Sequence, residues 1–422
     1  MNGLRFCFVT TFYPPYHFGG DAIGIDRLAR ALVRRGHQVT VVHDADAYRA
    51  LAGGRDPAGA LQPLDGLTVV PLESGVGILS PLVTQQLGRP VFTRGKLRAL
   101  LTDGGFDVIN FHNVSLIGGP GILSYGGDAL RVYMAHEHWL VCPSHVLWRH
   151  GRELCTARQC LRCVLSYRRP PQLWRYTGYL QRQLRGMDVV IAMSEFSRRK
   201  HAEFGLEQPM EVVPYFLPEN GGVDPSPKDD APDERPYFLF VGRLEKIKGL
   251  QDVIPLFRDA AADLLVAGDG EYRPELEGLA AGVPRVRFLG RVDAERLNAL
   301  YRGALALIVP SLCYETFGII LIEAFQHGTP VIARRLGPFP EIVEAAGAGI
   351  LFDSPTDLRQ GMAEMQQDPR AREAYSRRAR DAFRNHWTDS VVIPRYLEVI
   401  SQAAGRRGHD SIVRRLAETE AS

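Results

Sequence analysis

The feature that most constrains the fold of this chain is a strand, loop, helix and strand pattern at its start. An apolar run from Leu4 to Thr10 predicts a buried strand, and apolar residues at helical spacing from Ile25 to Val33 predict a helix. A glycine-bearing loop separates the two, Gly36 follows the helix, and Val39 to His43 predicts a second strand. This order is typical of the start of a doubly wound parallel sheet, so the sequence predicts an α/β fold.

The same pattern begins again in the second half of the chain. Tyr237 to Val241 predicts a strand, Gly242 to Gly249 a loop, and we expect a helix from Leu250. The residues before this restart are polar and rich in proline and glycine, which is the composition of a linker. The predicted parts are an N-terminal domain (1–218), a linker (219–236), a C-terminal domain (237–385) and a C-terminal helical segment that crosses back to the first domain (386–422). Because ligands of such sheets bind beyond the carboxyl ends of the strands, we expect a site in a central cleft that the two domains face.

Composition excludes several other classes of protein. Apolar residues make up 45% of the chain and charged residues 23%, which is typical of a globular protein. No apolar run approaches the roughly 18 residues that a membrane-spanning helix needs. The N-terminal apolar run is too short for a secretory signal, so we expect a cytoplasmic protein. In that reducing compartment the six cysteines are expected to be thiols or metal ligands rather than disulfides.

Two glutamates eight residues apart are the first candidates for a binding site. Glu315 falls in the loop after a predicted strand, and Glu323 lies in the helix that follows. The segment Thr316 to Gly318 places backbone amides at the start of that helix, where unpaired donors and the helix dipole favour anions and hydroxyl groups. For the two glutamates alone, an amphipathic helix with a solvated carboxylate remains the alternative.

Several motifs together resemble those of a known family. In the second half they are Gly242-Arg243, Lys248-Gly249, Gly268-Asp269-Gly270, Glu315 and Glu323. In the first half they are Tyr13-Pro14-Pro15, Gly19-Gly20, Phe106 to His112 and Ser194 to Ser197. With these motifs the chain resembles, over nearly its whole length, the family 4 glycosyltransferases, which have the GT-B fold of two Rossmann-like domains.

The resemblance implies a retaining glycosyltransferase with a nucleotide-sugar donor, a UDP- or GDP-sugar. It implies that Arg243 and Lys248 hold the diphosphate, whose negative charge grows as it leaves. It also implies that Glu323 binds the ribose and that Glu315 binds hydroxyls of the donor sugar. The other implied donor ligands are Gly19, Gly20, Arg291, Thr316, Phe317 and Gly318. For an arginine and a lysine at this spacing alone, a solvated surface remains the alternative.

Three histidines follow predicted strands of the N-terminal domain. The resemblance implies that His112 lies at the catalytic centre and contacts the transferred sugar. His136 and His138 follow the next strand and are expected on the acceptor side. A structural histidine is the alternative for a single residue of this kind. The family uses no catalytic metal, so none is implied here. Tyr215-Phe216 stands where many members have Asn-Gly, so this loop is expected to contact the ligand differently.

Four cysteines, Cys142, Cys155, Cys160 and Cys163, lie within 22 positions of one another in the N-terminal domain. The last two form a Cys-x2-Cys pair, which is a metal-knuckle spacing, and four thiolates suffice for a tetrahedral structural zinc. We therefore expect a cysteine-rich insertion near 142–163 that holds zinc. A set of buried thiols or a redox pair is the alternative.

A basic stretch in the same region bears on the acceptor. Between Arg149 and Lys200 there are 12 basic and 3 acidic residues, a net charge of +9, with five aromatic residues interleaved. Such a face suits anionic lipid headgroups at the inner face of the membrane, a lipid-linked sugar or an acidic glycan, and a solvated basic helix surface is the alternative. A nucleic-acid partner is not expected, because the whole chain carries only +2.

Two other functions remain open at this point. A nucleotide-sugar epimerase of the same fold would need no acceptor, and a non-catalytic sugar-nucleotide-binding protein would have lost phosphate or sugar ligands. The presence of Arg243, Lys248, Glu315 and Glu323 favours an enzyme that transfers sugar to a glycan, a lipid-linked sugar or a small molecule.

Overall fold

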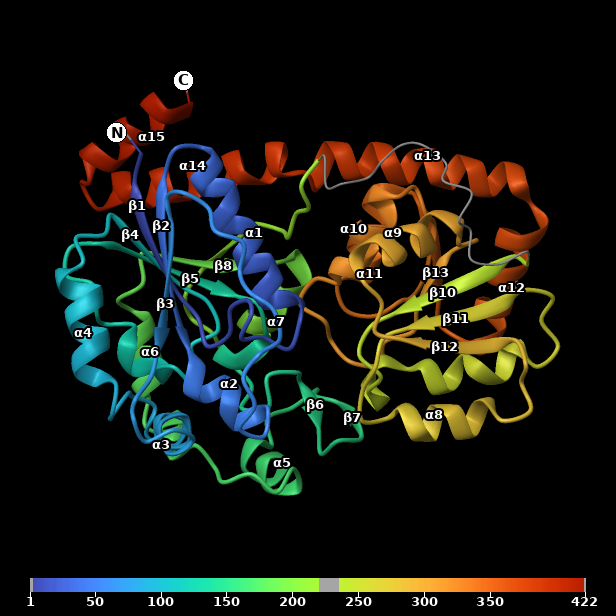
Figure 1. Cartoon of the computed structure of the whole chain (residues 1–422), viewed down its shortest axis with the longest axis horizontal. Helices are drawn as coiled ribbons and strands as arrows, with labels where there is room; N and C mark the ends of the chain where they lie inside the picture. The colour runs from blue at the N-terminus through green and yellow to red at the C-terminus, as the bar shows by residue number, and fades with distance from the viewer. Residues whose placement is uncertain (1–2, 220–234, 421–422) are drawn as a thin grey trace. The chain divides into compact units, whose positions relative to one another are not determined.

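The computed structural model describes residues 3–219 and 235–420, which form two compact units (Figure 1). The first unit comprises the described residues up to Tyr215 together with those from Val392 onward. The second runs from Phe216 to Val391. The predicted linker at 219–236 falls almost wholly outside the described residues. Each unit is built on its own sheet and is described by itself.

The first unit contains a parallel sheet of seven strands in the order β3-β2-β1-β4-β5-β8-β9. The strands are β1 (Arg5–Val9), β2 (Gln38–Asp44), β3 (Leu67–Leu72), β4 (Val108–Phe111), β5 (Leu130–Ala135), β8 (Val189–Ala192) and β9 (Met210–Val212). β1 pairs in parallel with both β2 and β4, so that Phe6 lies beside Val39 and Val108. The doubly wound sheet predicted from the sequence is confirmed, with β3 and β9 as additional edge strands.

Helices and one small hairpin complete the N-terminal part of this unit. The helices are α1 (Gly20–Arg34), α2 (Ala45–Leu51), α3 (Leu79–Leu87), α4 (Arg94–Asp103), α5 (Cys160–Ser166), α6 (Tyr179–Leu184) and α7 (Glu195–Glu203). As the spacing predicts, α1 buries Ile25, Leu28 and Leu32 and ends before Gly36, whose φ of 85° is left-handed. The hairpin pairs β6 (Trp148–Arg149) with β7 (Glu153–Leu154).

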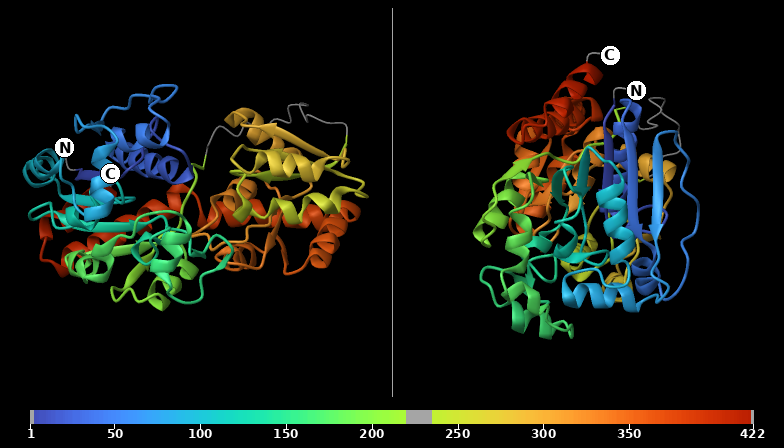
Figure 2. Two further views of the ribbon diagram at one scale, coloured as in Figure 1. Left: turned by 90° about the horizontal axis from the view of Figure 1, so that it is seen from below. Right: turned by 90° about the vertical axis from the view of Figure 1, so that its left-hand side faces the viewer.

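Two C-terminal helices, α14 (Asp389–Arg406) and α15 (Asp410–Glu420), pack on the sheet of the first unit from Val392 onward. Inside the core, Asn110 of β4 donates a hydrogen bond of 3.0 Å to the Tyr396 hydroxyl. Arg415 pairs with Asp107 at 2.8 Å, which holds α15 at the end of the sheet where β1 begins (Figure 2). No helix among the described residues is long and apolar enough to cross a bilayer.

The second unit contains a parallel sheet of six strands in the order β12-β11-β10-β13-β14-β15. The strands are β10 (Tyr237–Val241), β11 (Asp263–Ala267), β12 (Val286–Gly290), β13 (Leu307–Val309), β14 (Val331–Arg334) and β15 (Gly349–Phe352). The helices are α8 (Arg273–Ala280), α9 (Ala294–Gly303), α10 (Ile319–Gln326), α11 (Phe339–Ala346), α12 (Pro355–Gln367) and α13 (Pro369–His386). The second doubly wound sheet is thus confirmed as well.

The prediction of an α-helix that begins at Leu250 is wrong. The chain forms two 3₁₀ turns there, η5 (Leu250–Asp252) and η6 (Ile254–Phe257). Pro255 lies inside the expected helix, where it offers no backbone N–H and its ring collides with the preceding turn. The side chains of Leu250, Ile254 and Phe257 are nevertheless buried in the core of the unit, as the apolar pattern requires.

Two glycines allow the loops after β10 and β11 to lie against each other. Gly268 has a φ of 142°, and a Cβ placed on it would lie 1.9 Å from the carbonyl oxygen of Gly242. A Cβ on Gly270 would lie 2.4 Å from the carbonyl oxygen of Leu244. Because backbone rather than a flexible side chain is the obstacle, neither position can accept a larger residue without moving the loop that bears Lys248.

We therefore expect Gly268→Ala to lower the free energy of unfolding of the second unit by at least ~2 kcal/mol. Gly278→Ala is the matched control, since a Cβ there meets nothing within 4 Å on helix α8. That control should be neutral or should stabilise by up to ~1 kcal/mol. Calorimetric unfolding of the two variants makes the comparison, and similar melting profiles for both would contradict it.

Candidate active site

The candidate residues lie at the carboxyl ends of the strands where each sheet changes direction. In the first unit the strand order turns between β1 and β4, and in the second between β10 and β13. At such a point the two loops leave the sheet on opposite sides and open a crevice at its edge. The loop after β4 carries His112, and the loops after β10 and β13 carry Lys248 and Glu315.

Lys248 and Glu315 are brought into direct contact in the second unit. Lys248 Nζ lies 2.5 Å from Glu315 Oε1, and the two side chains are 21% and 25% exposed. Their loops are also joined through the backbone, because Leu312 N–H donates to the Ile247 carbonyl at 2.8 Å. Gly249 lets the loops approach this closely, since a Cβ there would lie 2.1 Å from the Pro310 carbonyl oxygen. Two residues that lie 67 positions apart thereby form one half-buried ion pair.

The charges around Lys248 favour its cationic form. Burial lowers the pKa of Lys248, but the charge of Glu315 and the hydrogen bond to it outweigh that effect, so the pKa is raised above its ordinary value. The charge of Arg243 acts on Lys248 in the opposite direction, which places the two cations within electrostatic reach of each other. Arg243 is 62% exposed and pairs with Glu245 at 2.9 Å. Two neighbouring cations of this kind form a site that an anion would stabilise.

Helix α10 carries the second glutamate. It begins after Gly318, whose φ of 97° is left-handed and where a Cβ would lie 2.6 Å from the ring of Phe339. Glu323 is half-buried on this helix and accepts a hydrogen bond of 3.0 Å from the Tyr301 hydroxyl. Burial and the neighbouring carboxylate of Glu323 raise the pKa of Tyr301 well above its ordinary value, so its hydroxyl keeps its proton and orients the carboxylate.

The remaining donor candidates come from several loops: Thr316 and Phe317 directly follow Glu315, whereas Arg291, Gly19 and Gly20 are distant from it in sequence. Arg291 is exposed in the loop after β12, and no hydrogen bond or ion pair to a described residue joins it to Lys248 or Glu315. Thr316 and Phe317 precede α10, with the Phe317 side chain 2% exposed. Gly19 and Gly20 lie in the first unit, where the loop after β1 enters α1. Gly19 has an extended φ of −164°, and the nearest atom to a Cβ there is 3.7 Å away, so the fold of this unit does not itself demand a glycine.

In the first unit His112, His136 and Tyr215 form a hydrogen-bonded chain. His112 Nδ1 lies 2.8 Å from His136 Nε2, and His136 Nδ1 lies 2.5 Å from the Tyr215 hydroxyl. The two imidazole rings stack with centroids 5.1 Å apart. Gly24 of α1 leaves room for the phenol, because a Cβ there would lie 2.6 Å from the Tyr215 ring. Residues that follow three strands, β4, β5 and β9, thus form one row of polar groups in an otherwise apolar core.

Burial keeps the two histidines neutral at physiological pH. Burial and then the charge of His136 lower the pKa of His112 well below its ordinary value, and burial lowers the pKa of His136 to about 4. A neutral imidazole has one donor and one acceptor nitrogen, so the bond that His136 makes to Tyr215 decides which nitrogen it offers His112. His112 Nε2 is buried and has no hydrogen-bond partner among the described residues.

His138 occupies a different place from His136. It lies in the 3₁₀ turn η2 (His138–Leu140), is 1% exposed, and its ring centroid lies 5.2 Å from that of His201 of α7 in a tilted arrangement. The residue between them, Glu137, has its Oε1 2.8 Å from His145 Nδ1. The structure therefore separates two histidines that the sequence predicts to share one role. His136 contacts His112, whereas His138 contacts His201.

The four clustered cysteines converge on one pocket. Cys142, Cys155, Cys160 and Cys163 all line it, and they are free thiols. In residues 3–219 and 235–420, no three His, Cys, Asp or Glu side chains are already gathered as a metal-ligand set. Cys7 and Cys313 are buried away from this group, and burial raises the pKa of Cys313 to about 12.

Sequence reasoning missed two functional partners, Tyr215 and Tyr301. The departure at Tyr215-Phe216 marked the first position without showing what it contacts. Tyr301 lies on α9 as one aromatic residue of a buried helical face, and nothing in its local sequence distinguishes it from a core residue. Both assignments needed the pairing of elements that are distant in the chain.

Comparison with known proteins shows the family of this chain. The model of glycosyltransferase family 4 matches residues 18–218, and that of glycosyl transferases group 1 matches residues 225–382. A phosphatidyl-myo-inositol mannosyltransferase of Mycobacterium leprae is 28% identical over 92% of this chain and 96% of its own length. The chain belongs to glycosyltransferase family 4. An uncharacterized glycosyltransferase of Methanocaldococcus jannaschii (33% identical) and a D-rhamnosyltransferase of Pseudomonas aeruginosa (32% identical) match over less than half of their own length, 43% and 42%.

Solved structures identify the fold of this family 4 member as GT-B. Sucrose-phosphate synthase from Thermosynechococcus elongatus superposes with a TM-score of 0.72 and 18% identity, over 96% of this chain and all of the other. Anabaena HepE in complex with UDP superposes with a TM-score of 0.66 and 18% identity, over 94% of this chain and all of the other. At these identities the likeness describes the fold.

The histidine chain of this family 4 member can be tested through its stability. Tyr215→Phe removes the hydroxyl that bonds to His136 Nδ1 in a buried place, so we expect the free energy of unfolding of the first unit to fall by about 1–2 kcal/mol. Tyr125→Phe is the control, because the hydroxyl of the half-buried Tyr125 bonds to no described residue. Urea unfolding would measure both, and equal midpoints for Tyr215→Phe and the wild type would refute the contribution of this bond.

Proposed function

We propose that this protein transfers a sugar from a UDP- or GDP-sugar to an acceptor hydroxyl with retention of configuration at the transferred carbon. The observation that carries the proposal is the Lys248 to Glu315 ion pair at the direction change of the second sheet, with the exposed cation of Arg243 within electrostatic reach. The membership in family 4 supports sugar transfer, and two structures of HepE, one in complex with UDP and one with UDP-glucose, support a nucleotide-sugar donor.

In the second unit we assign the diphosphate to Arg243 and Lys248. Their mutual repulsion is relieved when an anion binds between them, and the relief is greatest for the nucleoside diphosphate that departs with additional charge. Glu323, oriented by Tyr301, is assigned to the ribose hydroxyls. Glu315 is assigned to the hydroxyls of the donor sugar, together with the amides of Thr316, Phe317 and Gly318. Arg291 is assigned to the surroundings of the base.

In the first unit we assign His112 to the transferred sugar. Its buried Nε2 has no hydrogen-bond partner within residues 3–219 and 235–420, and a buried polar atom of this kind costs free energy unless a ligand or water bonds to it. Gly19 and Gly20 are assigned to the phosphates, because no protein atom crowds Gly19 and a side chain there would occupy space that a ligand needs. His136 is assigned to the acceptor side through its contact with His112, and His138 to the support of that loop.

The proposed chemistry is a substitution on one face of the sugar. The bond from the anomeric carbon to the diphosphate oxygen breaks, and a bond to the acceptor oxygen forms on the same face. The acceptor proton passes to the departing phosphate oxygen. Because the acceptor oxygen attacks the anomeric carbon directly, no protein carboxylate acts as a nucleophile. Arg243 and Lys248 supply the positive charge that stabilises the leaving group, and the proposal assigns no step to a metal ion.

Replacement of Lys248 tests the donor site. Lys248→Ala should lower transfer by a factor on the order of 100 or more, because it removes a few kcal/mol of stabilisation of the leaving diphosphate. Lys246→Ala is the control: this exposed lysine lies two positions away and its side chain contacts no charged partner among the described residues. The readout is release of nucleoside diphosphate from UDP-glucose and GDP-mannose, after a thermal-shift screen with UDP, GDP, ADP, CDP and TDP has ranked the bases.

The outcomes of that assay separate the three functions. Release of diphosphate that depends on Lys248 and increases with an acceptor supports transfer. Conversion of the nucleotide sugar to an isomer without diphosphate release would make the protein an epimerase. Binding of nucleotide without either reaction would make it a binding protein, and unchanged turnover in Lys248→Ala would remove the assigned diphosphate site.

We further propose that the acceptor is presented at an anionic membrane, through a surface here named the basic apolar surface. It consists of α3, the 3₁₀ turn η3 (Leu173–Tyr176) and α5 of the first unit. Its large apolar side chains are half or more exposed at Ile78 (55%), Leu82 (50%), Leu165 (55%), Leu173 (67%) and Tyr176 (59%). Exposed apolar groups beside basic ones are the pattern of a protein that rests on anionic lipid.

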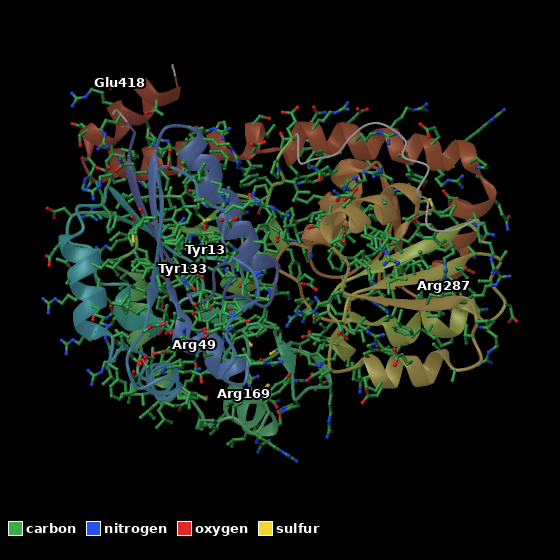
Figure 3. All side chains as sticks on the ribbon, in the orientation of Figure 1. Tyr13, Arg49, Tyr133, Arg169, Arg287 and Glu418 are labelled. Carbon is green, nitrogen blue, oxygen red and sulfur yellow. The ribbon has the colours of Figure 1, made fainter. Side chains whose placement is uncertain are left out.

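The three elements of this surface are joined. Trp174 of η3 donates from Nε1 to the Gln85 carbonyl of α3 at 3.0 Å, and Arg162 of α5 lines a cleft together with Arg175 and Tyr176 of η3. Arg169, labelled in Figure 3, is exposed and lies three residues after the end of α5. The cleft contains Arg158 as well, so its positive charge suits the phosphate of a lipid headgroup.

Vesicle co-sedimentation tests the basic apolar surface. We expect binding to phosphatidylglycerol vesicles that weakens with salt, and little binding to phosphatidylcholine. Arg162→Glu combined with Arg169→Glu should reduce binding by about thirtyfold or more, since each reversal removes roughly 1 kcal/mol or more. Arg258→Glu combined with Arg359→Glu, two exposed arginines of the second unit, is the control. Equal, salt-insensitive binding to both lipids, or none to either, would exclude the lipid surface.

A further inference from the structure

The four cysteines of the first unit have no part in the proposed transfer. They come from three separate pieces of chain: Cys142 after η2, Cys155 after β7, and Cys160 and Cys163 on α5. All four nevertheless line one pocket, together with the apolar side chains of Leu147, Val164 and Phe204. Thiols from three pieces of chain around a single space are unusual in a core, where isolated cysteines such as Cys7 pack singly.

The segment that carries these cysteines has little apolar core of its own. Between residues 142 and 169 only Cys142, Leu147 and Val164 have buried apolar side chains. Its hairpin strands β6 and β7 are two residues long each, and α5 leaves Leu161 and Leu165 about half exposed. A fold of this size with so little apolar burial ordinarily needs a covalent or metal link to stay ordered.

The backbone of this segment is held in a costly conformation. In the described chain, the residues other than glycine with positive φ are His145 (72°), Leu147 (48°), His150 (54°) and Arg168 (55°), and all of them lie here. Such conformations cost free energy and persist only where surrounding contacts impose them. The few apolar contacts of the segment are a weak source of that constraint, whereas a link among the cysteines would supply it directly.

A half-buried cation next to the cysteines lacks a carboxylate. Arg175 stacks on the ring of Trp174 at 4.5 Å, donates to the Trp139 carbonyl at 2.9 Å, and pairs with no acidic side chain among the described residues. Its buried Nη2 has no hydrogen-bond partner there. The groups of opposite potential charge that act on it are the thiols of Cys142 and Cys160, followed by the phenols of Tyr133 and Tyr176. Negative charge on the sulfur cluster would compensate this guanidinium.

We propose that Cys142, Cys155, Cys160 and Cys163 bind one structural zinc ion as four thiolates. Cys163 already accepts a backbone hydrogen bond at Sγ from His150 N at 3.3 Å, which is the contact that stabilises a thiolate ligand. In the thiol form, Cys155 Sγ faces the Ala157 carbonyl at 3.5 Å. Zinc binding replaces the four thiol protons, which are released to solvent, and leaves a complex with two negative charges beside Arg175.

The proposed zinc site is coupled to the loop that follows β5. Cys142 N–H donates to the His138 carbonyl at 2.8 Å, and His138 N–H donates to the His145 carbonyl at 3.0 Å. The site thereby fixes the chain just beyond His136. This inference does not depend on the proposed transfer, because zinc binding is measured directly on the protein.

Metal content of the purified full chain is the first test. We expect about one zinc per chain after purification without chelator, and loss of that zinc together with titration of four additional thiols after treatment with an organomercurial. Cys160→Ser should retain less than a tenth of the zinc, while Cys7→Ala, which removes a cysteine of the same unit outside the cluster, should keep it. Both variants should still bind nucleotide in the second unit.

A second measurement covers the case in which Cys160→Ser does not fold. The wild-type protein grown with Co²⁺ in place of zinc should show intense sulfur-to-cobalt charge-transfer absorption and a d–d band typical of tetrahedral thiolate coordination. Zinc near zero with all four thiols freely titratable in the native state would overturn the site. So would two disulfides among the four cysteines, or full zinc retention in Cys160→Ser.

Discussion

Everything in this molecule depends on the parallel direction of the strands in its two sheets. Parallel strands must all end at the same edge, so the loops that follow them are delivered to one place whatever their distance in sequence. His112 and His136 meet because β4 and β5 are neighbours in register, with Asn110 beside Val132. Lys248 and Glu315 meet because β10 pairs with β13. The apolar residues that hold the strands together therefore also assemble the polar groups.

The polar groups at these edges are satisfied in pairs, which is what allows them to be half-buried or buried. Lys248 without Glu315, or His136 without Tyr215, would leave a charge or a lone pair in a poorly solvated place. The same requirement explains why glycines crowd these loops. Gly249 and Gly268 let one backbone lie against another where any side chain would separate the paired groups. Precision at the site thus rests on close backbone contact rather than on extra interactions of the functional side chains.

The cysteine-bearing segment follows a different physical logic from the two sheets. The sheets are stabilised by wholly buried strands such as β4 and β11, whose side chains contribute to continuous apolar layers. The segment from Cys142 to Arg169 contributes little to either layer and leaves Leu161, Leu165 and most of its arginines exposed. It is an addition to the fold whose order comes from local links, and this leaves its outer surface available for a partner.

The sequence by itself determined the two α/β halves, most of their strands and most of the polar residues at the strand ends. It could do so because apolar periodicity and glycine positions are local signals, which report burial of a strand or helix directly. Only the tertiary structure decided which polar residues touch. Tyr301 bonds to Glu323, Tyr215 bonds to His136, and His138 contacts His201 instead of joining His136. These contacts form because strand order and helix docking place residues from distant positions side by side. The segment around Pro255 likewise forms 3₁₀ turns instead of the expected α-helix. The apolar pattern is compatible with either form, but proline lacks the N–H that an α-helix needs at this position.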